Sequence, residues 1–85
     1  MKELKVKEWI IDKAQQTARA YHCWISYARR DEDGRPTRED GCVYVWIEEE
    51  ISETEKAIHV RLATGEMDGS VKGWKVWIPK SQIAA

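Results

Sequence analysis

The sequence contains no phenylalanine, no asparagine and only two prolines, and none of its apolar runs is long enough to cross a membrane. The segment Met1–Lys5 lacks the apolar core of a secretory signal peptide, so we expect a cytoplasmic protein with no membrane partner. Two cysteines, Cys23 and Cys42, are too few for a disulfide framework, and reduced thiols are the expectation for an intracellular chain.

Five tryptophans supply part of the apolar area that phenylalanine would otherwise provide. A chain of 85 residues has room for one modest core, so we predict a single domain over residues 1–85.

The charges are unevenly distributed, although the net charge is only −1. Residues 1–30 hold seven Lys/Arg against three Asp/Glu, residues 31–70 hold four against twelve, and residues 71–85 hold three against none. If the two ends of the chain meet in space, they could form a local basic patch; otherwise these charges are ordinary solvated surface.

The first half of the chain predicts a strand, a helix and a second strand. Residues 4–7 alternate in the manner of a strand, and good helix formers with helical apolar spacing fill residues 8–19. Residues 21–28 are rich in β-favouring types and predict a strand. No glycine or proline lies between residues 8 and 30, so the helix could instead continue to Arg30, and the state of residues 20–30 stays open. Residues 30–41 are polar and contain Gly34, Pro36 and Gly41, which indicates a loop.

The second half alternates in the manner of strands. Strands are predicted at residues 42–51, 56–63 and 74–79, with a turn at 52–54 and a loop at 64–73. Both faces of 42–51 are apolar, which is typical of a central strand. The sequence therefore predicts an α+β fold: a small curled antiparallel sheet or partly open barrel, SH3-like or OB-like, of about five strands with one N-terminal helix.

Aromatic and basic side chains recur on one face of this predicted sheet. If the aliphatic residues of the three strands point inward, the pleat turns the alternate residues outward. That outward set is Tyr44, Trp46, His59, Arg61, Lys75 and Trp77, with Lys72 and Lys80 nearby to contact phosphate. Rings interleaved with cations are typical of surfaces that bind single-stranded nucleic acid. The alternative is that the helix covers this face and that the rings form a second core layer.

Few residues have the spacing of a catalytic or metal site. His22, Cys23, Cys42 and His59 do not match the ligand spacing of a zinc site, and no glycine-rich phosphate-binding motif is present. No nucleophile has an evident base and orienting residue. We therefore expect a protein that is not an enzyme and has no cofactor and no metal.

An acidic run, Glu48–Glu50 with Glu53 and Glu55, supports a different function. Such an acidic stretch, together with an exposed strand edge, would suit a protein-interaction module that acts as an adaptor or inhibitor of a host or replication complex. The partner would be another protein, and the chain itself would be a monomer or a homodimer formed by pairing of strand edges.

Two short motifs resemble a signature of small, largely uncharacterised proteins associated with phages and plasmids. Glu53–Ala57 reads E-T-E-K-A and Trp77–Gln82 reads W-I-P-K-S-Q, and the likeness covers residues 51–83. The resemblance implies a compact β-rich domain in a phage or another mobile element, and it assigns no catalytic residues.

Overall fold

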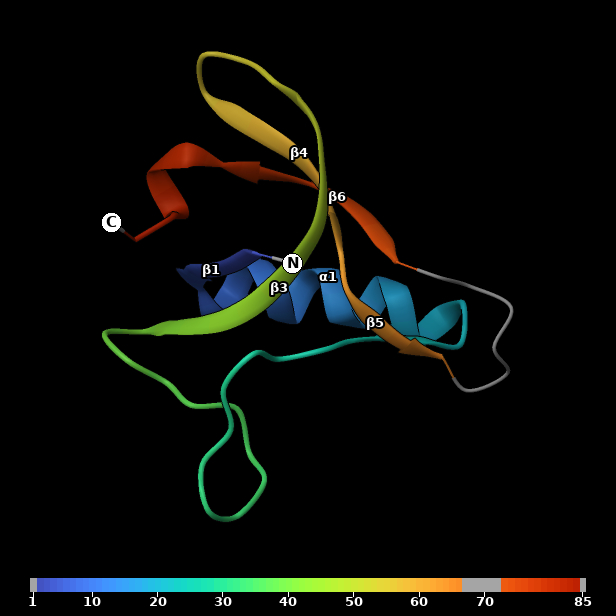
Figure 1. The fold of residues 1–85 in the computed structure, drawn as a ribbon, viewed down its shortest axis with the longest axis vertical. Helices are drawn as coiled ribbons and strands as arrows, with labels where there is room; N and C mark the ends of the chain where they lie inside the picture. The colour runs from blue at the N-terminus through green and yellow to red at the C-terminus, as the bar shows by residue number, and fades with distance from the viewer. Residues whose placement is uncertain (1, 67–72, 85) are drawn as a thin grey trace.

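The described part of the chain folds into one α-helix and two antiparallel sheets (Figure 1). The computed structural model describes residues 2–66 and 73–84. Its elements are β1 (Lys2–Lys7), α1 (Glu8–Ala20), β2 (Cys23–Ile25), β3 (Cys42–Glu53), β4 (Ala57–Leu62), β5 (Thr64–Glu66), β6 (Trp74–Pro79) and the 3₁₀ helix η1 (Lys80–Gln82). One sheet has the strand order β1-β3-β4-β6, and the other pairs β2 with β5. No helix of the described residues is long and apolar enough to span a bilayer.

These elements confirm the α+β class, but the barrel is not confirmed. Over the described residues the four-stranded sheet is not closed into a barrel. β3 pairs with β1 through its first half and with β4 through its second half, which makes it a central strand as predicted. Register shifts between Ile47 and Glu49 and between Glu50 and Ser52 mark irregularities where this long strand passes from one partner to the other.

Helix α1 ends at Ala20, which answers the open question about residues 20–30. The Tyr21 and His22 N–H groups donate to the last helical turn, and His22 has a φ of 59°, a left-handed conformation that ends the helix. No side chain caps the start of α1, but the Glu8 N–H donates to the Gly41 carbonyl at 2.9 Å. The loop that ends at Gly41 therefore takes the place of a side-chain cap.

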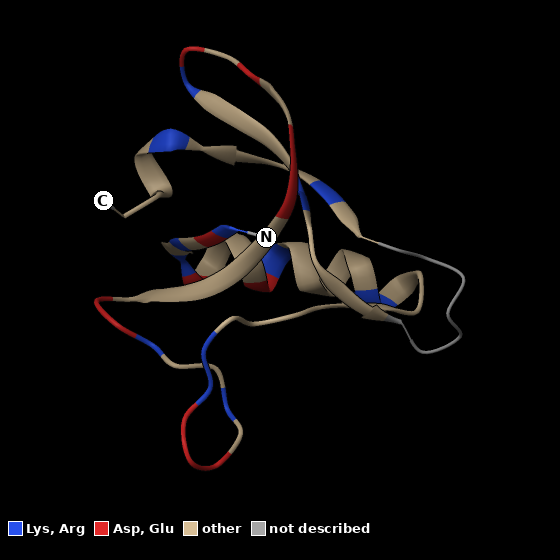
Figure 2. Ribbon diagram, viewed as in Figure 1, with Lys and Arg blue, Asp and Glu red and all other residues tan. Residues whose placement is uncertain are grey.

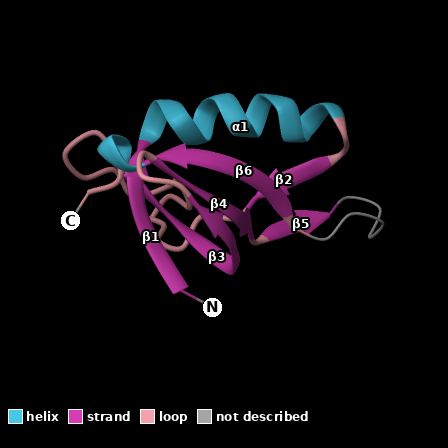
Figure 3. Cartoon of the chain, turned by 90° about the horizontal axis from the view of Figure 1, so that it is seen from above, coloured by secondary structure: helices cyan, strands magenta, loops and turns pink. Residues whose placement is uncertain are grey.

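The core lies between α1 and one face of the larger sheet (Figure 3). Residues at helical spacing on α1 meet alternate residues of the strands, as the pleat predicts. The most buried side chains are those of Val6, Ile11, Ala18, Cys23, Ile25, Cys42, Val43, Val45, Val60, Leu62 and Ile78. Both cysteines are free thiols, and both are buried.

The predicted boundaries differ most from the structure at three places. Ser52 and Glu53 belong to β3 rather than to a turn, and the chain reverses just after them, where the Thr54 N–H donates to the Ala57 carbonyl at 2.8 Å. The predicted loop at 64–73 begins with a strand, because Thr64–Glu66 pairs with β2. The strand predicted at 21–28 is shorter, since regular pairing covers only Cys23–Ile25.

The two ends of the described chain meet, and the lysines where they meet are paired with carboxylates. Ile83 bridges to Val6, and the Ala84 N–H donates to the Lys5 carbonyl at 3.0 Å. The lysines there lie beside carboxylates of the acidic middle of the chain: Lys2 contacts Glu50, Lys5 contacts Glu39 and Asp40, and Lys80 contacts Glu53. Blue and red segments accordingly alternate around the fold in Figure 2.

Candidate functional site

The outer face of the sheet, which is the face turned away from α1, carries the predicted ring and cation positions. Across β4 and β6, His59 is opposite Trp77 and Arg61 is opposite Lys75. Residues directly opposite each other in a sheet point to the same side, so these four side chains share the outer face. No element from residues 8–20 covers them, because α1 packs on the other face.

Trp77 and His59 form a stacked pair on this face. Their ring centroids lie 4.4 Å apart with an interplanar angle of 9°, and 49% of Trp77 is exposed. The prediction that the Trp77 indole points into solvent is confirmed, whereas Trp46 on β3 is half-buried. One face of the Trp77 indole is thus stacked on the His59 ring, while much of the rest of its surface is exposed to solvent.

The prediction that Tyr44 belongs to an exposed platform is wrong, because only 7% of this residue is exposed. The Arg29 guanidinium lies over its ring at 4.0 Å, and Arg29 is held there by two hydrogen bonds to Glu3. The Tyr44 hydroxyl donates to Glu39 at 3.0 Å. This hydrogen bond, together with nearby Lys5, lowers the pKa of the Glu39 carboxyl below its ordinary value. Tyr44 therefore ties the 30–41 loop to the sheet.

The predicted phosphate-binding cations are largely engaged by carboxylates. Arg61 lies near Glu49 at 3.6 Å and Glu48 at 3.9 Å, and Lys80 contacts Glu53. Lys72 lies outside the described residues. Of the predicted set, only Lys75 is an exposed cation with no ion pair among the described residues. Within the acidic run, Glu48 and Glu49 lie near Arg61, Glu50 contacts Lys2 and Glu53 contacts Lys80.

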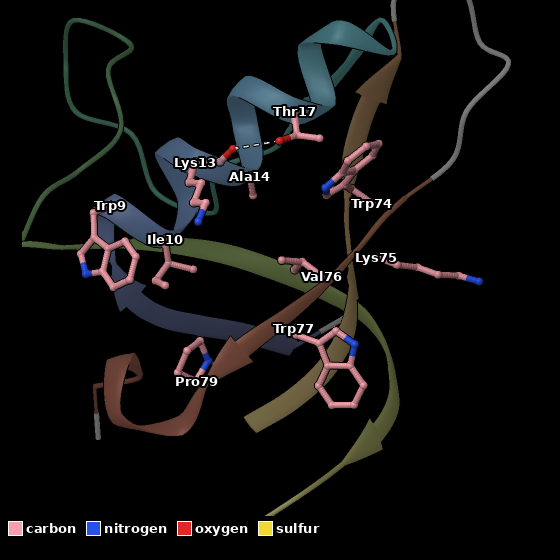
Figure 4. Close-up of a pocket in the computed structure, with 10 residues that line it drawn as sticks. All are labelled: Trp9, Ile10, Lys13, Ala14, Thr17, Trp74, Lys75, Val76, Trp77 and Pro79. Carbon is pink, nitrogen blue, oxygen red and sulfur yellow. Dashed lines mark hydrogen bonds between the residues drawn. The ribbon is translucent and has the colours of Figure 1, made fainter. Parts of the chain in front are cut away.

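A second surface, which the sequence did not predict, is a groove of about 510 Å³ between α1 and β6 (Figure 4). We call it the α1–β6 groove. Ile10 and Ala14 of the helix and Val76 of the strand point into it, as the close-up shows. Among the described residues, its lining is Trp9, Ile10, Lys13, Ala14, Thr17, Trp74, Lys75, Val76, Trp77 and Pro79, a set with no carboxylate.

Strand β6 forms one wall of this groove. β6 is the last strand of its sheet, so one of its edges has no partner strand among the described residues. The Lys80 N–H donates to the Lys56 carbonyl at 2.8 Å, so these two residues form a hydrogen-bonded pair in the register of β4 and β6. Along an antiparallel ladder, hydrogen-bonded pairs alternate with non-hydrogen-bonded pairs, so every second residue of β6 before Lys80 also bonds to β4. Trp74, Val76 and Ile78 therefore bond to β4, whereas the N–H and C=O groups of Lys75 and Trp77 point away from it. We call these outward groups the β6 edge.

The groove is bounded at the end near Pro79. The Trp9 indole N–H donates to the Gln82 side-chain oxygen at 3.2 Å, and Trp9 is 55% exposed. Pro79 has no N–H, so it can donate no further ladder hydrogen bond beyond Trp77. The site thus offers two outward donors, Lys75 and Trp77, beside an apolar floor.

The signal for this groove in the sequence was incomplete. Trp9, Lys13 and Thr17 recur at four-residue spacing, which places them on one stripe of the helix. Nothing local indicates that this stripe faces β6, or that β6 is an edge strand. The described residues contain no cluster of three or more potential metal ligands.

Comparisons with protein-family models, with curated proteins and with solved structures give no match to this chain. Its function is therefore inferred from the geometry of the two surfaces.

Proposed function

We propose that this protein is a non-enzymatic protein-interaction module that binds an extended segment of a partner protein as an additional strand. The observation that carries the proposal is the β6 edge: the register leaves the main-chain groups of Lys75 and Trp77 unbonded to β4, and both residues line the α1–β6 groove. An exposed strand edge beside a hydrophobic groove is a recurring mode of peptide recognition: main-chain hydrogen bonds give affinity and side-chain pockets give specificity.

The charges of the molecule favour this function over nucleic-acid binding. Arg29, Arg61 and Lys80 each contact a carboxylate of the same chain, so little positive charge remains on the outer face to attract phosphate. Strand addition needs no such field, because the main-chain groups supply the contacts.

Replacing Lys75 with proline is expected to weaken peptide binding roughly ten-fold, because it removes one of the two outward N–H donors. Proline is tolerated on an edge strand where its nitrogen faces away from the ladder, so the fold should persist. Linear peptides would be selected from a random display library on the wild-type protein, and their dissociation constants would be measured by calorimetry.

Lys75→Ala is the matched control, since it removes the same side chain and keeps the N–H. The comparison is made with uncharged peptides, so that loss of the Lys75 charge has no effect of its own. If Lys75→Ala weakens their binding as much as Lys75→Pro, the main-chain edge is not the binding element. A library that yields no binder to the folded wild-type protein would refute the proposed function.

A second candidate function, favoured by a separate observation, is binding of single-stranded nucleic acid through the exposed Trp77–His59 stack and Lys75. Stacking of a base on an aromatic ring is worth about 1–3 kcal/mol. This surface is smaller than the predicted platform, because Tyr44 is buried and Arg61 is paired.

Trp77→Ala is expected to reduce the affinity for a labelled oligothymidylate about ten-fold or more, in a titration at low salt. Wild-type binding should weaken as salt rises. Trp24→Ala serves as the control, because Trp24 is 40% exposed on β2 and lies under Arg19. Equal losses in the two variants, or no wild-type binding at low salt, would eliminate this candidate.

A further inference from the structure

We infer that the segment bound in the α1–β6 groove is an acidic peptide in which small apolar side chains alternate with carboxylates. This inference rests on the proposed function and specifies the chemistry of the partner. It follows from the pleat of the added strand and from the two cations at the groove.

The pleat fixes which peptide side chains enter the groove. A peptide residue opposite Val76 points to the same side as Val76, toward Ile10 and Ala14 of the helix. Ala14 and Val76 have small side chains and leave space for a peptide side chain between the helix and the strand, so a small apolar residue suits this position of the peptide. The peptide residues on either side of it point to the outer face, beside the Lys75 and Trp77 side chains.

The described residues that line the groove carry charge of one sign. Lys13 on the helix rim and Lys75 on β6 are both exposed, and neither forms an ion pair with any described residue. By contrast, Lys5, Arg61 and Lys80 are each matched by a carboxylate of the chain. Two unmatched cations beside an apolar floor complement a segment that carries negative charge.

The same charges disfavour a second copy of this chain as the occupant. β6 itself carries Lys75 and no carboxylate, so pairing of two β6 strands would add positive charge to a groove that already has Lys13 and Lys75. An acidic strand from a different protein neutralises the groove instead.

The test uses three capped peptides of about eight residues in which valine alternates with glutamate, serine or lysine, a length that spans β6. Calorimetry at low salt is expected to rank them glutamate, serine, lysine in order of falling affinity. We expect about a ten-fold step between the first two, which should shrink as salt is added. In the double variant Lys13→Glu/Lys75→Glu the order should reverse. Lys56→Glu, a charge reversal in the β3–β4 turn, should leave it unchanged.

The outcomes separate this inference from the proposed function. If the three peptides bind equally, or the lysine peptide binds best, while Lys75→Pro weakens all of them, the acidic partner is refuted and strand addition stands. If none of them binds and the display library also yields no binder, both are refuted. A wild-type dimer in sedimentation that Lys75→Pro converts to a monomer would place a second copy at the β6 edge and overturn the acidic partner.

Discussion

Replacing Gln15 with leucine is expected to lower the free energy of unfolding by about 2–4 kcal/mol, although leucine has a similar size and is more apolar. Gln15 is 8% exposed, and its amide makes two hydrogen bonds to one residue of β2. It accepts from the Ile25 N–H at 2.7 Å and donates to the Ile25 carbonyl at 3.3 Å. On the side of β2 that faces the helix, where the described residues provide no neighbouring strand, the Gln15 amide thus satisfies the main-chain N–H and C=O of Ile25.

Leucine would leave both main-chain groups of Ile25 without this partner in a buried site, since Ile25 is 2% exposed. Each buried unsatisfied group costs about 1–3 kcal/mol, and the added apolar burial offsets only part of that. The midpoint of thermal unfolding, followed by circular dichroism, should fall by roughly 10–20 °C for a chain of this size.

Gln16→Leu is the matched control, because Gln16 is the next residue and is exposed. Its effect should stay within about 0.5 kcal/mol. A Gln15→Leu protein as stable as the wild type would mean that the bridge between α1 and β2 contributes nothing to stability.

Replacing Gly73 with alanine is expected to destabilise the protein by about 2–3 kcal/mol, for two independent reasons. Gly73 has a φ of 82°, which costs roughly 1–2 kcal/mol for a residue with a side chain. A Cβ at this position would also lie 2.5 Å from Cγ and Cδ of Arg61. Arg61 would have to move away from Glu48 and Glu49, and with it the outer face beside Lys75 would change.

Two other glycines separate the two effects. Gly41 has a φ of 73°, and a Cβ added there would have no neighbouring atom within 4 Å, so Gly41→Ala should show the backbone cost alone. Gly65 has neither a positive φ nor a close neighbour, so Gly65→Ala should be neutral or slightly stabilising. Urea unfolding of the three variants is expected to rank the losses Gly73, Gly41, Gly65, and equal losses at Gly73 and Gly41 would refute the clash with Arg61.

Much of the fold could be predicted because it depends on patterns within short segments. The helix predicted at residues 8–19 is α1, one residue longer at its end. The two-faced apolar strand beginning at Cys42 is central, with β1 on one side and β4 on the other. The alternation in 74–79 placed Val76 and Trp77 on opposite faces, as the structure has them.

The candidate sites were harder to predict, because they depend on contacts between distant residues. Tyr44 lies on the outer side of the pleat, yet Arg29 and Glu39 from the preceding loop region cover it. Arg61 alternates outward as expected, but carboxylates of β3 neutralise it. Periodicity gives the direction of a side chain and cannot show what lies above it.

By itself, the sequence determined the type of each main element and the face on which each alternate side chain lies, because backbone geometry repeats every two or 3.6 residues. Only the tertiary structure decided that β6 is an edge strand, that α1 runs beside that edge, and that Lys13 and Lys75 are left without a carboxylate among the described residues. These features arise from the pairing order of strands and from contacts between α1 and β6, which lie far apart along the chain, and no local periodicity encodes that order.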